Sequence, residues 1–233
     1  MCVRAPVTLF QPRAKSHIAS PMRSLLPLSL AAFLALAACA GPEAEAPLAD
    51  PTASPAPVTE GAWSLDPAAS RLAYVSIKAG EVAENNRFDT LSGSVAADGT
   101  ASLSIDLASV STGVEIRDER MREVFFAVAD NPAATVTAKL DPARFAGLAV
   151  GQSVLRPLTA EVTIKGATAE VETEVLVTRT AEDRVLVVTA APVIVSTDMF
   201  GLTDELGELR ALAQLPSITP AVPVTFTLTF TRG

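Results

Sequence analysis

The sequence predicts a mainly β domain, built as a sandwich or a barrel of eight strands with one or two short helices in the connecting loops. Two observations lead to this fold class. From Trp63 onward, apolar and polar residues alternate with a period of two in many short segments, which is typical of strands with one buried face. Turn signals that contain glycine separate some of these segments, and many short strands in one chain favour a sandwich or a barrel.

Eight segments carry the strand pattern, and they are 70–79, 86–96, 100–108, 133–140, 153–165, 169–179, 184–196 and 222–231. The last segment is the clearest, because threonines alternate there with Val222, Val224, Phe226, Leu228 and Phe230. Similar inward series are Ala101, Leu103, Ile105 and Leu107, then Val162 and Ile164, then Val171 and Val175. The turn signals "ADGT" (97–100) and "KGAT" (165–168) each join two neighbouring strands.

Two segments between the strands have helical spacing instead. In 115–126, residues Ile116, Arg120 and Val124 recur at intervals of four, which places them on one side of a helix. In 204–215, the leucines of "DELGELRALAQL" follow the same rule. We therefore expect short helices in the connections and strands elsewhere.

The N-terminal segment indicates secretion and a lipid anchor. Residues 24–38 form an uncharged apolar run, too short to span a bilayer comfortably, which takes about 20 residues, but suited to a signal peptide. It leads into "LAAC" (36–39), which resembles the bacterial lipobox, whose cysteine is lipidated and becomes the first mature residue. We predict a signal peptide over 1–38, with Met22 as an alternative start, and lipidation at Cys39. A plain secretory signal with a cysteine beside its cleavage site is the alternative.

Residues 39–61 are predicted to be the lipidated cysteine and a Pro/Ala-rich tether, and residues 62–233 the folded domain. Five prolines fall within 40–60, where no large hydrophobic cluster occurs. Pro-rich segments of this kind stay extended and bury too little apolar surface to fold.

Composition excludes several functions. Without residues 1–38 the chain has 14 basic and 26 acidic residues, a net charge of −12, which argues against binding to nucleic acid. The single histidine, His17, lies in the removed segment. A mature chain without histidine, whose one cysteine is acylated, excludes a Ser-His-Asp triad, a Cys-His pair and the usual zinc sites. We expect no metal and no cofactor, while chemistry by Asp and Glu alone stays open.

Four segments resemble a known family. They are "WSLDPAASRLAYVSIK" (63–78), "STGVEIRDERMREVFF" (111–126), "LTAEVTIKGATAEV" (158–171) and "STDMFGL" (196–202), the last with Met199 inserted before Phe200. In this order they are similar to the YceI-like family of periplasmic proteins over most of 63–231. The usual histidines of the first strand and of the Arg-Asp segment are absent, since Ala73–Lys78 has none and Glu119 follows Asp118.

The resemblance implies an eight-stranded antiparallel lipocalin-like β-barrel with a long apolar pocket for a polyisoprenoid or similar chain. No catalytic residue carries over from the family, so we predict a binding protein and not an enzyme. The leading hypothesis is an envelope lipoprotein that binds, carries or sequesters such a lipid. The alternatives are a lipid-modifying enzyme that uses Asp and Glu only, and a structural or interaction domain whose barrel is packed solid.

The candidate ligand-binding residues lie mainly in the Arg-Asp segment. Arg117, beside Asp118 and with Arg120 or Arg122, would face a phosphate-like head group at the pocket mouth, since arginine pairs bidentately with phosphate. The alternative is an Arg117–Asp118 pair that pins the loop to the barrel. The aromatic candidates, which would either cap the lumen against a prenyl chain or plug the core, are Phe125, Phe126 and Phe200.

The expected partners are the lipid ligand and the membrane reached through the anchor on Cys39. The predicted localisation is the cell envelope on the periplasmic side. Ala40 follows the cysteine in place of the aspartate that marks inner-membrane retention, so the outer membrane is favoured.

Overall fold

The computed structural model of the chain describes residues 61–233, so the predicted signal peptide, Cys39 and residues 40–60 of the tether lie outside the described residues. The strands are β1 (Trp63–Leu65), β2 (Arg71–Lys78), β3 (Val82–Phe88), β4 (Leu91–Val95), β5 (Thr100–Asp106), β6 (Val110–Ser111), β7 (Ala133–Lys139), β8 (Ser153–Ile164), β9 (Ala167–Ala181), β10 (Arg184–Thr189), β11 (Val193–Ser196) and β12 (Ala221–Arg232). The helices and helical turns are η1 (Pro67–Ala69), η2 (Leu107–Ser109), α1 (Glu115–Arg120), η3 (Met121–Phe125), η4 (Pro142–Phe145), η5 (Thr197–Phe200) and α2 (Thr203–Leu212). Within this part of the chain, no helix has the length and apolar character needed to cross a membrane.

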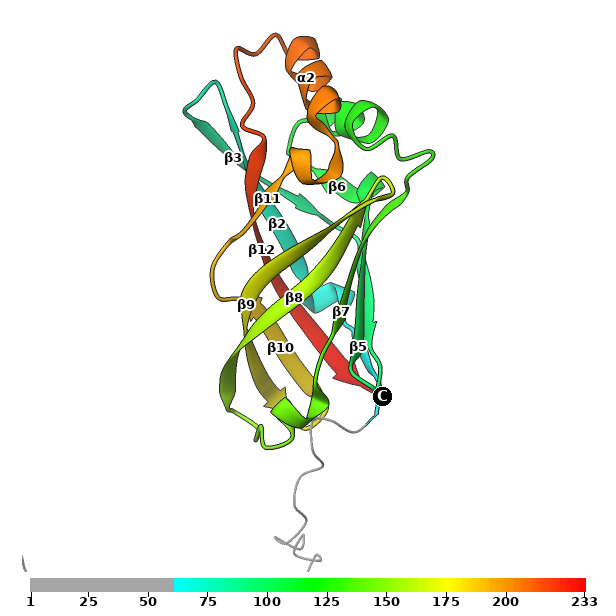
Figure 1. Cartoon of the computed structure of the whole chain (residues 1–233), viewed down its shortest axis with the longest axis vertical. Helices are drawn as coiled ribbons and strands as arrows, with labels where there is room; N and C mark the ends of the chain where they lie inside the picture. The colour runs from blue at the N-terminus through cyan, green and yellow to red at the C-terminus, as the bar shows by residue number, and fades with distance from the viewer. Residues whose placement is uncertain (1–60) are drawn as a thin grey trace, which may run out of the picture. The chain divides into compact units, whose positions relative to one another are not determined.

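The strands close into an antiparallel barrel of eight, which confirms the predicted fold (Figure 1). The ring runs β1-β4-β5-β7-β8-β9-β10-β12 and returns to β1, because β1 pairs with both β4 and β12. The remaining strands extend the wall toward one end, where β2 pairs with β12, β3 with β2, β6 with β3, and β11 with β12. These two pairings of β1 close the ring, so neither long side of β1 is left as a free sheet edge.

Two of the predicted strands are interrupted in the structure. The predicted strand 86–96 is divided into β3 and β4 by Asp89 and Thr90, and 184–196 is divided into β10 and β11 by residues 190–192. At the first break the two halves meet different partners, because β4 pairs with β1 while β3 pairs with β2, whereas β10 and β11 both pair with β12. The inward residues have even numbers on β3 and odd numbers on β4, so the first break shifts the alternation, whereas the inward residues have odd numbers on both β10 and β11.

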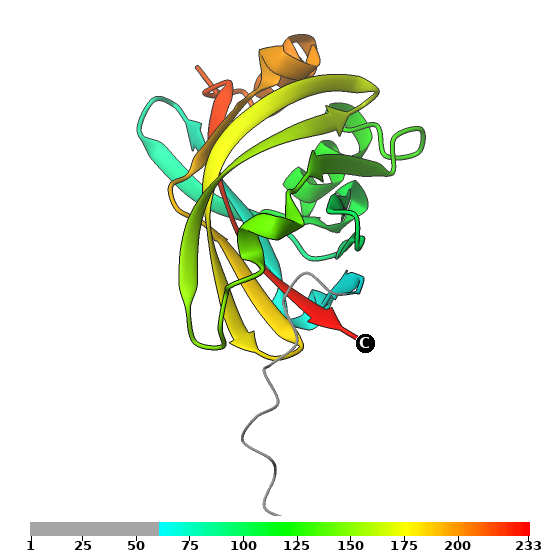
Figure 2. The same ribbon diagram turned by 60° about the horizontal axis from the view of Figure 1, so that its bottom comes forward.

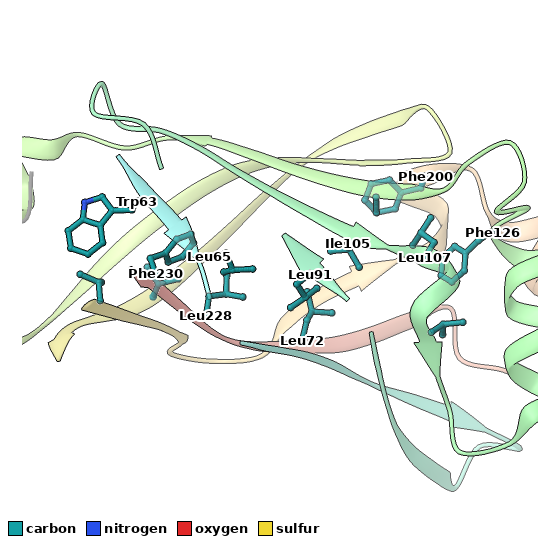
Figure 3. Packing of buried hydrophobic residues seen from close by; sticks show 14 of the residues in the cluster. Trp63, Leu65, Leu72, Leu91, Ile105, Leu107, Phe126, Phe200, Leu228 and Phe230 are labelled. Atoms are coloured by element: carbon teal, nitrogen blue, oxygen red, sulfur yellow. The ribbon is translucent and has the colours of Figure 1, made fainter. Parts of the chain in front are cut away.

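The inward faces follow the predicted alternation. The whole series from Val222 to Phe230 on β12 lines the barrel interior, as do Ala101, Leu103 and Ile105 on β5. Residues two apart on a strand share a face, so every second residue of each strand points inward, and these apolar residues form the core. The buried cluster extends along the barrel from Trp63 near one end to Phe126 and Phe200 near the other (Figure 3).

The two predicted turns are confirmed. Between β4 and β5, Gly99 has a φ of 85°, and a Cβ at this position would lie 2.2 Å from the carbonyl oxygen of Leu140, so the turn requires glycine. Between β8 and β9, Lys165 and Gly166 have φ values of 50° and 78°, as a two-residue hairpin turn of the primed type requires.

The helices α1 and α2, with the helical turn η3, gather at one end of the barrel, shown at the top of Figure 1. The segment predicted as one helix over 115–126 begins as α1 and ends in the π-helical turn η3. The second predicted helix is α2, which packs against η3. Lys165 at the hairpin turn donates to the Glu205 carboxylate at 2.7 Å, so an ion pair joins α2 to the β8–β9 hairpin.

The β8–β9 hairpin is joined to the rest of the wall over only part of its length, and it arches away in Figure 2. β7 pairs with β8 through residues 135–137 and 161–163 alone, so the first half of β8 has no partner strand on that side. On the other side, the pairing of β10 with β9 ends at Val175. We call the gap between the first half of β8 and the β7–η4 segment the β8 seam.

Candidate functional site

A cavity of about 630 Å³ lies inside the barrel, and its size falls within the range of about 300–1,000 Å³ that is usual for small-molecule sites. Most of its wall consists of apolar side chains on the inward faces of the strands. Several of these side chains are small, and examples are Ala101, Ala134, Ala138, Ala160, Val136 and Val162. Because such side chains fill an eight-stranded barrel incompletely, the barrel is not packed solid.

Aromatic rings form the cavity wall next to the helices. The rings of Phe125 and Phe126 meet edge to face with centroids 4.9 Å apart, and Phe126 lies 5.9 Å from Phe88. Phe88 in turn lies 5.8 Å from Tyr74 on β2. Phe125, Phe126 and Phe200 are all buried and all line the cavity, so the two roles considered for them, closing the barrel and facing its interior, coincide.

Arg117 is held by partners within the protein. Its Nε donates to the hydroxyl oxygen of Thr112 at 2.9 Å and its Nη2 to the carbonyl oxygen of Thr112 at 2.9 Å. Its Nη1 forms an ion pair with the carboxylate of Glu84 on β3. The same carboxylate also accepts a hydrogen bond from the Lys78 ammonium at 2.9 Å. The guanidinium therefore lies at the cavity wall with a carboxylate already bound to it.

Asp118 fixes the same loop from the other side. Its carboxylate accepts hydrogen bonds from the backbone N–H of Thr112, at 2.7 Å, and from the Thr112 hydroxyl. Arg117 and Asp118 thus share Thr112 as a partner and do not pair with each other, which corrects the direct Arg117–Asp118 pair considered above. The loop is nevertheless pinned to the barrel, because Arg117 reaches β3 through Glu84.

The pKa values of two groups reflect this arrangement. Partial burial raises the pKa of Glu84, but the hydrogen bonds from Lys78 and Arg117 outweigh burial and hold it below its ordinary value. Burial raises the pKa of Tyr74 well above its ordinary value, against the opposing field of Arg117. At neutral pH the tyrosine is uncharged and the glutamate is ionised.

The remaining predicted residues are only partly brought together. Arg120 lines the cavity, whereas Arg122 does not, so only Arg120 of this pair reaches the cavity wall. Among residues 61–233, Arg120 takes part in no ion pair. Cys39 lies outside the described residues and stays a prediction. Within those residues, no cluster of three or more potential metal ligands occurs.

Sequence reasoning missed three charged residues of the cavity wall, Lys78, Glu84 and Arg156. Glu84 lies 33 residues before Arg117, and no local pattern links them. Arg156 lies on β8 and shares the inward face of this strand with the alternate residues Leu158, Ala160, Val162 and Ile164, all of which line the cavity. That alternation is visible in "SVLRPLTAEVTI", so an inward-facing arginine could have been predicted from it.

Comparison with known proteins gives the family. The model of the YceI-like domain matches residues 63–230, whereas no curated protein matches the chain significantly. Among solved structures, a polyisoprenoid-binding domain from Saccharophagus degradans, implicated in plant cell wall breakdown, is 38% identical with a TM-score of 0.72. The match covers 73% of this chain and 98% of that one.

A second solved structure supports the fold alone. BcnA from Burkholderia cenocepacia is 23% identical with a TM-score of 0.55, and the match covers 71% of this chain and 98% of BcnA. The order of the four sequence segments, the closed eight-stranded barrel and the domain match over residues 63–230 all agree. The chain therefore belongs to the YceI-like family.

Proposed function

We propose that residues 61–233 bind a long-chain isoprenoid, or a similar amphiphilic lipid, inside the barrel, and that the protein carries or sequesters this lipid. The observation that supports the proposal most directly is the apolar cavity of about 630 Å³. The 38% identical domain from Saccharophagus degradans is a polyisoprenoid-binding domain, which makes an isoprenoid the guest to test first.

Burial of the chain supplies the affinity in this proposal. Each methylene taken out of water contributes about 0.8 kcal/mol, so ten of them contribute about 8 kcal/mol. That equals the free energy of a complex with a Kd of about 1 μM, before the costs of ordering the guest are subtracted. Strong head-group contacts are therefore unnecessary, which suits an Arg117 that is already paired with Glu84.

The test is to identify what the purified protein holds. The full chain, expressed with its own N-terminal segment, is purified, denatured and extracted with organic solvent, and the extract is analysed by mass spectrometry. We expect a long prenyl or comparable acyl lipid in stoichiometric amount. A lipid-free extract, together with no uptake of a labelled prenyl chain by the refolded protein, would contradict the proposal.

The same preparation separates binding from catalysis. We expect the bound lipid to be recovered chemically unchanged after prolonged incubation with the protein. Conversion of the lipid that is lost in Asp118→Asn would favour the lipid-modifying enzyme instead, since carboxylates can supply acid–base chemistry in a chain without a mature histidine.

We also propose that the protein is a lipoprotein of the cell envelope, anchored through Cys39, facing the periplasm and located in the outer membrane. The support is the sequence "LAAC" behind a short apolar run, followed by Ala40. Cys39→Ser should release the protein from washed membranes, because a stable anchor needs two or more acyl chains on the cysteine. Recovery of an intact Cys39→Ser protein in the membrane pellet would contradict this.

A further inference from the structure

Arg156 is an arginine on the inward face of a strand that is otherwise apolar on that face. It pairs in register with Val175 on β9, whose side chain is buried and lines the cavity. Residues that are directly paired across antiparallel strands point to the same face. The arginine therefore continues the inward series of Ile164, Val162, Ala160 and Leu158 and lies in the cavity wall.

The Arg156 guanidinium has only neutral partners within residues 61–233. Its Nη1 donates to the carbonyl oxygen of Leu155 at 3.0 Å and its Nη2 to that of Arg144 at 3.1 Å. Its Nε is shielded from water and has no hydrogen-bond partner in this part of the chain. Among the described residues, no carboxylate lies within 4.0 Å of its nitrogens.

The other cations of the cavity wall differ from Arg156. Lys78 and Arg117 share the carboxylate of Glu84. Arg120 has no ion pair among residues 61–233, but no nitrogen of its side chain is both buried and unpartnered. A charged group that is partly buried without a counter-ion costs free energy that an arriving anion would recover. Arg156 is thus the cation of the wall with the strongest physical reason to bind one.

Arg156 lies where the barrel wall is open enough for an anion to approach its guanidinium. It lies beside the β8 seam, where the first half of β8 has no partner strand on the β7 side. Pro157, which follows it, has no N–H, and proline within a strand is confined to such edge positions. Residues on both sides of the seam line the same cavity, among them Phe145 on η4 and Leu158 on β8.

We propose that Arg156 is a head-group site at the β8 seam, which binds the oxyanion of a long-chain lipid, a phosphate or a carboxylate, while the chain extends into the barrel. Guanidinium donates two parallel hydrogen bonds to such groups. The inference rests on the proposed function, because it assumes that a lipid chain occupies the cavity. It places the charged end of the lipid away from Arg117, whose charge Glu84 already balances.

The experiment compares three labelled lipids of matched chain length on the full chain after removal of bound lipid: a prenyl monophosphate, the corresponding prenyl alcohol and a fatty carboxylate. The expected result is that the wild type binds the phosphate about ten- to hundredfold more tightly than the alcohol, the usual range for a hydrogen bond to a charged group. A carboxylate that binds as tightly as the phosphate would identify a general oxyanion site, and a weaker carboxylate a phosphate site. Binding of the alcohol equal to both anions would overturn the inference.

Variants then locate the preference. Arg156→Gln should bring the phosphate-to-alcohol ratio close to one while affinity for the alcohol changes by no more than about twofold, because only the charged contact is lost. The matched control is Arg144→Gln, an exposed arginine of the same region, which should keep the wild-type ratio. Arg120→Gln tests the rival head-group position at the helical end, and the proposal expects it to retain the preference for the phosphate. If Arg120→Gln abolishes the preference instead, the head group lies at the helical end and the proposal is wrong.

A purely structural role for Arg156 gives a different result. The arginine also joins β8 to η4 through the carbonyl oxygen of Arg144, so Arg156→Gln could lower the melting temperature without changing the ratio, which would refute the site. Should Arg156→Gln fail to fold, Arg156→Lys is the substitute, because it keeps the positive charge but loses the two parallel N–H donors of the guanidinium. Its phosphate-to-alcohol affinity ratio should be above one but below the wild-type ratio. If no lipid of any kind binds the wild type, the proposed function itself has failed.

Discussion

The substitution Ala160→Phe tests directly whether the cavity holds the ligand. Ala160 is buried on the inward face of β8 and lines the cavity. A benzyl group placed there takes up room for at least about three methylenes of a guest, which removes about 2.4 kcal/mol of chain burial. Since 1.4 kcal/mol is a factor of ten, the Kd for a prenyl chain should rise by about fiftyfold.

The same substitution has the opposite meaning for a barrel without free interior space. Overpacking a filled core costs about 1–3 kcal/mol, which lowers the melting temperature of a domain of this size by about 2–4 °C per kcal/mol. A cavity of about 630 Å³ can accept the ring, so the melting temperature of the lipid-free protein should be unchanged or higher.

The measurements are thermal unfolding followed by circular dichroism and equilibrium binding of a labelled prenyl chain. Thr159→Phe is the matched control, because Thr159 is the exposed neighbour on the same strand and points away from the cavity. It should change neither quantity by much. A fall in melting temperature with no loss of binding in Ala160→Phe would refute the argument that the guest occupies this space.

Three further predictions concern stability. Arg179→Met should destabilise the domain by about 2–4 kcal/mol, because the buried guanidinium donates to two backbone carbonyl groups; urea unfolding beside the exposed control Arg184→Met measures this, and equal effects would contradict it. Gly99→Ala should lower the melting temperature by several degrees, since the φ of 85° disfavours a side chain and its Cβ would lie 2.2 Å from a carbonyl oxygen; an unchanged melting temperature would contradict it. The hydrogen bond from Lys165 lowers the pKa of Glu205, so the stability from this pair is complete above the ordinary glutamate pKa of about 4.3 and is lost as the pH falls through the lower folded value; melting temperatures measured from pH 6 to pH 3 should decline less in Glu205→Gln than in the wild type.

Local sequence determined which residues face the barrel interior. The alternation on β5, β8, β9 and β12 predicted inward residues that the structure places in the cavity wall. This succeeds because side chains on a strand alternate between two faces whatever the partner strand is. Turn chemistry was also local, since positive φ angles at Gly99 and at Lys165–Gly166 follow from short motifs.

The tertiary structure decided what those faces enclose. Strand breaks between β3 and β4 and between β10 and β11, and the closure of β1 onto β4 and β12, depend on contacts between distant segments. The ion pair of Arg117 with Glu84, 33 residues away in the chain, and the volume of the cavity depend on the same closure. The local sequence specifies to which face of its strand each side chain points. The volume of the cavity and the pairing of charges in its wall depend on side chains from all eight strands, so they are defined only once the barrel has closed.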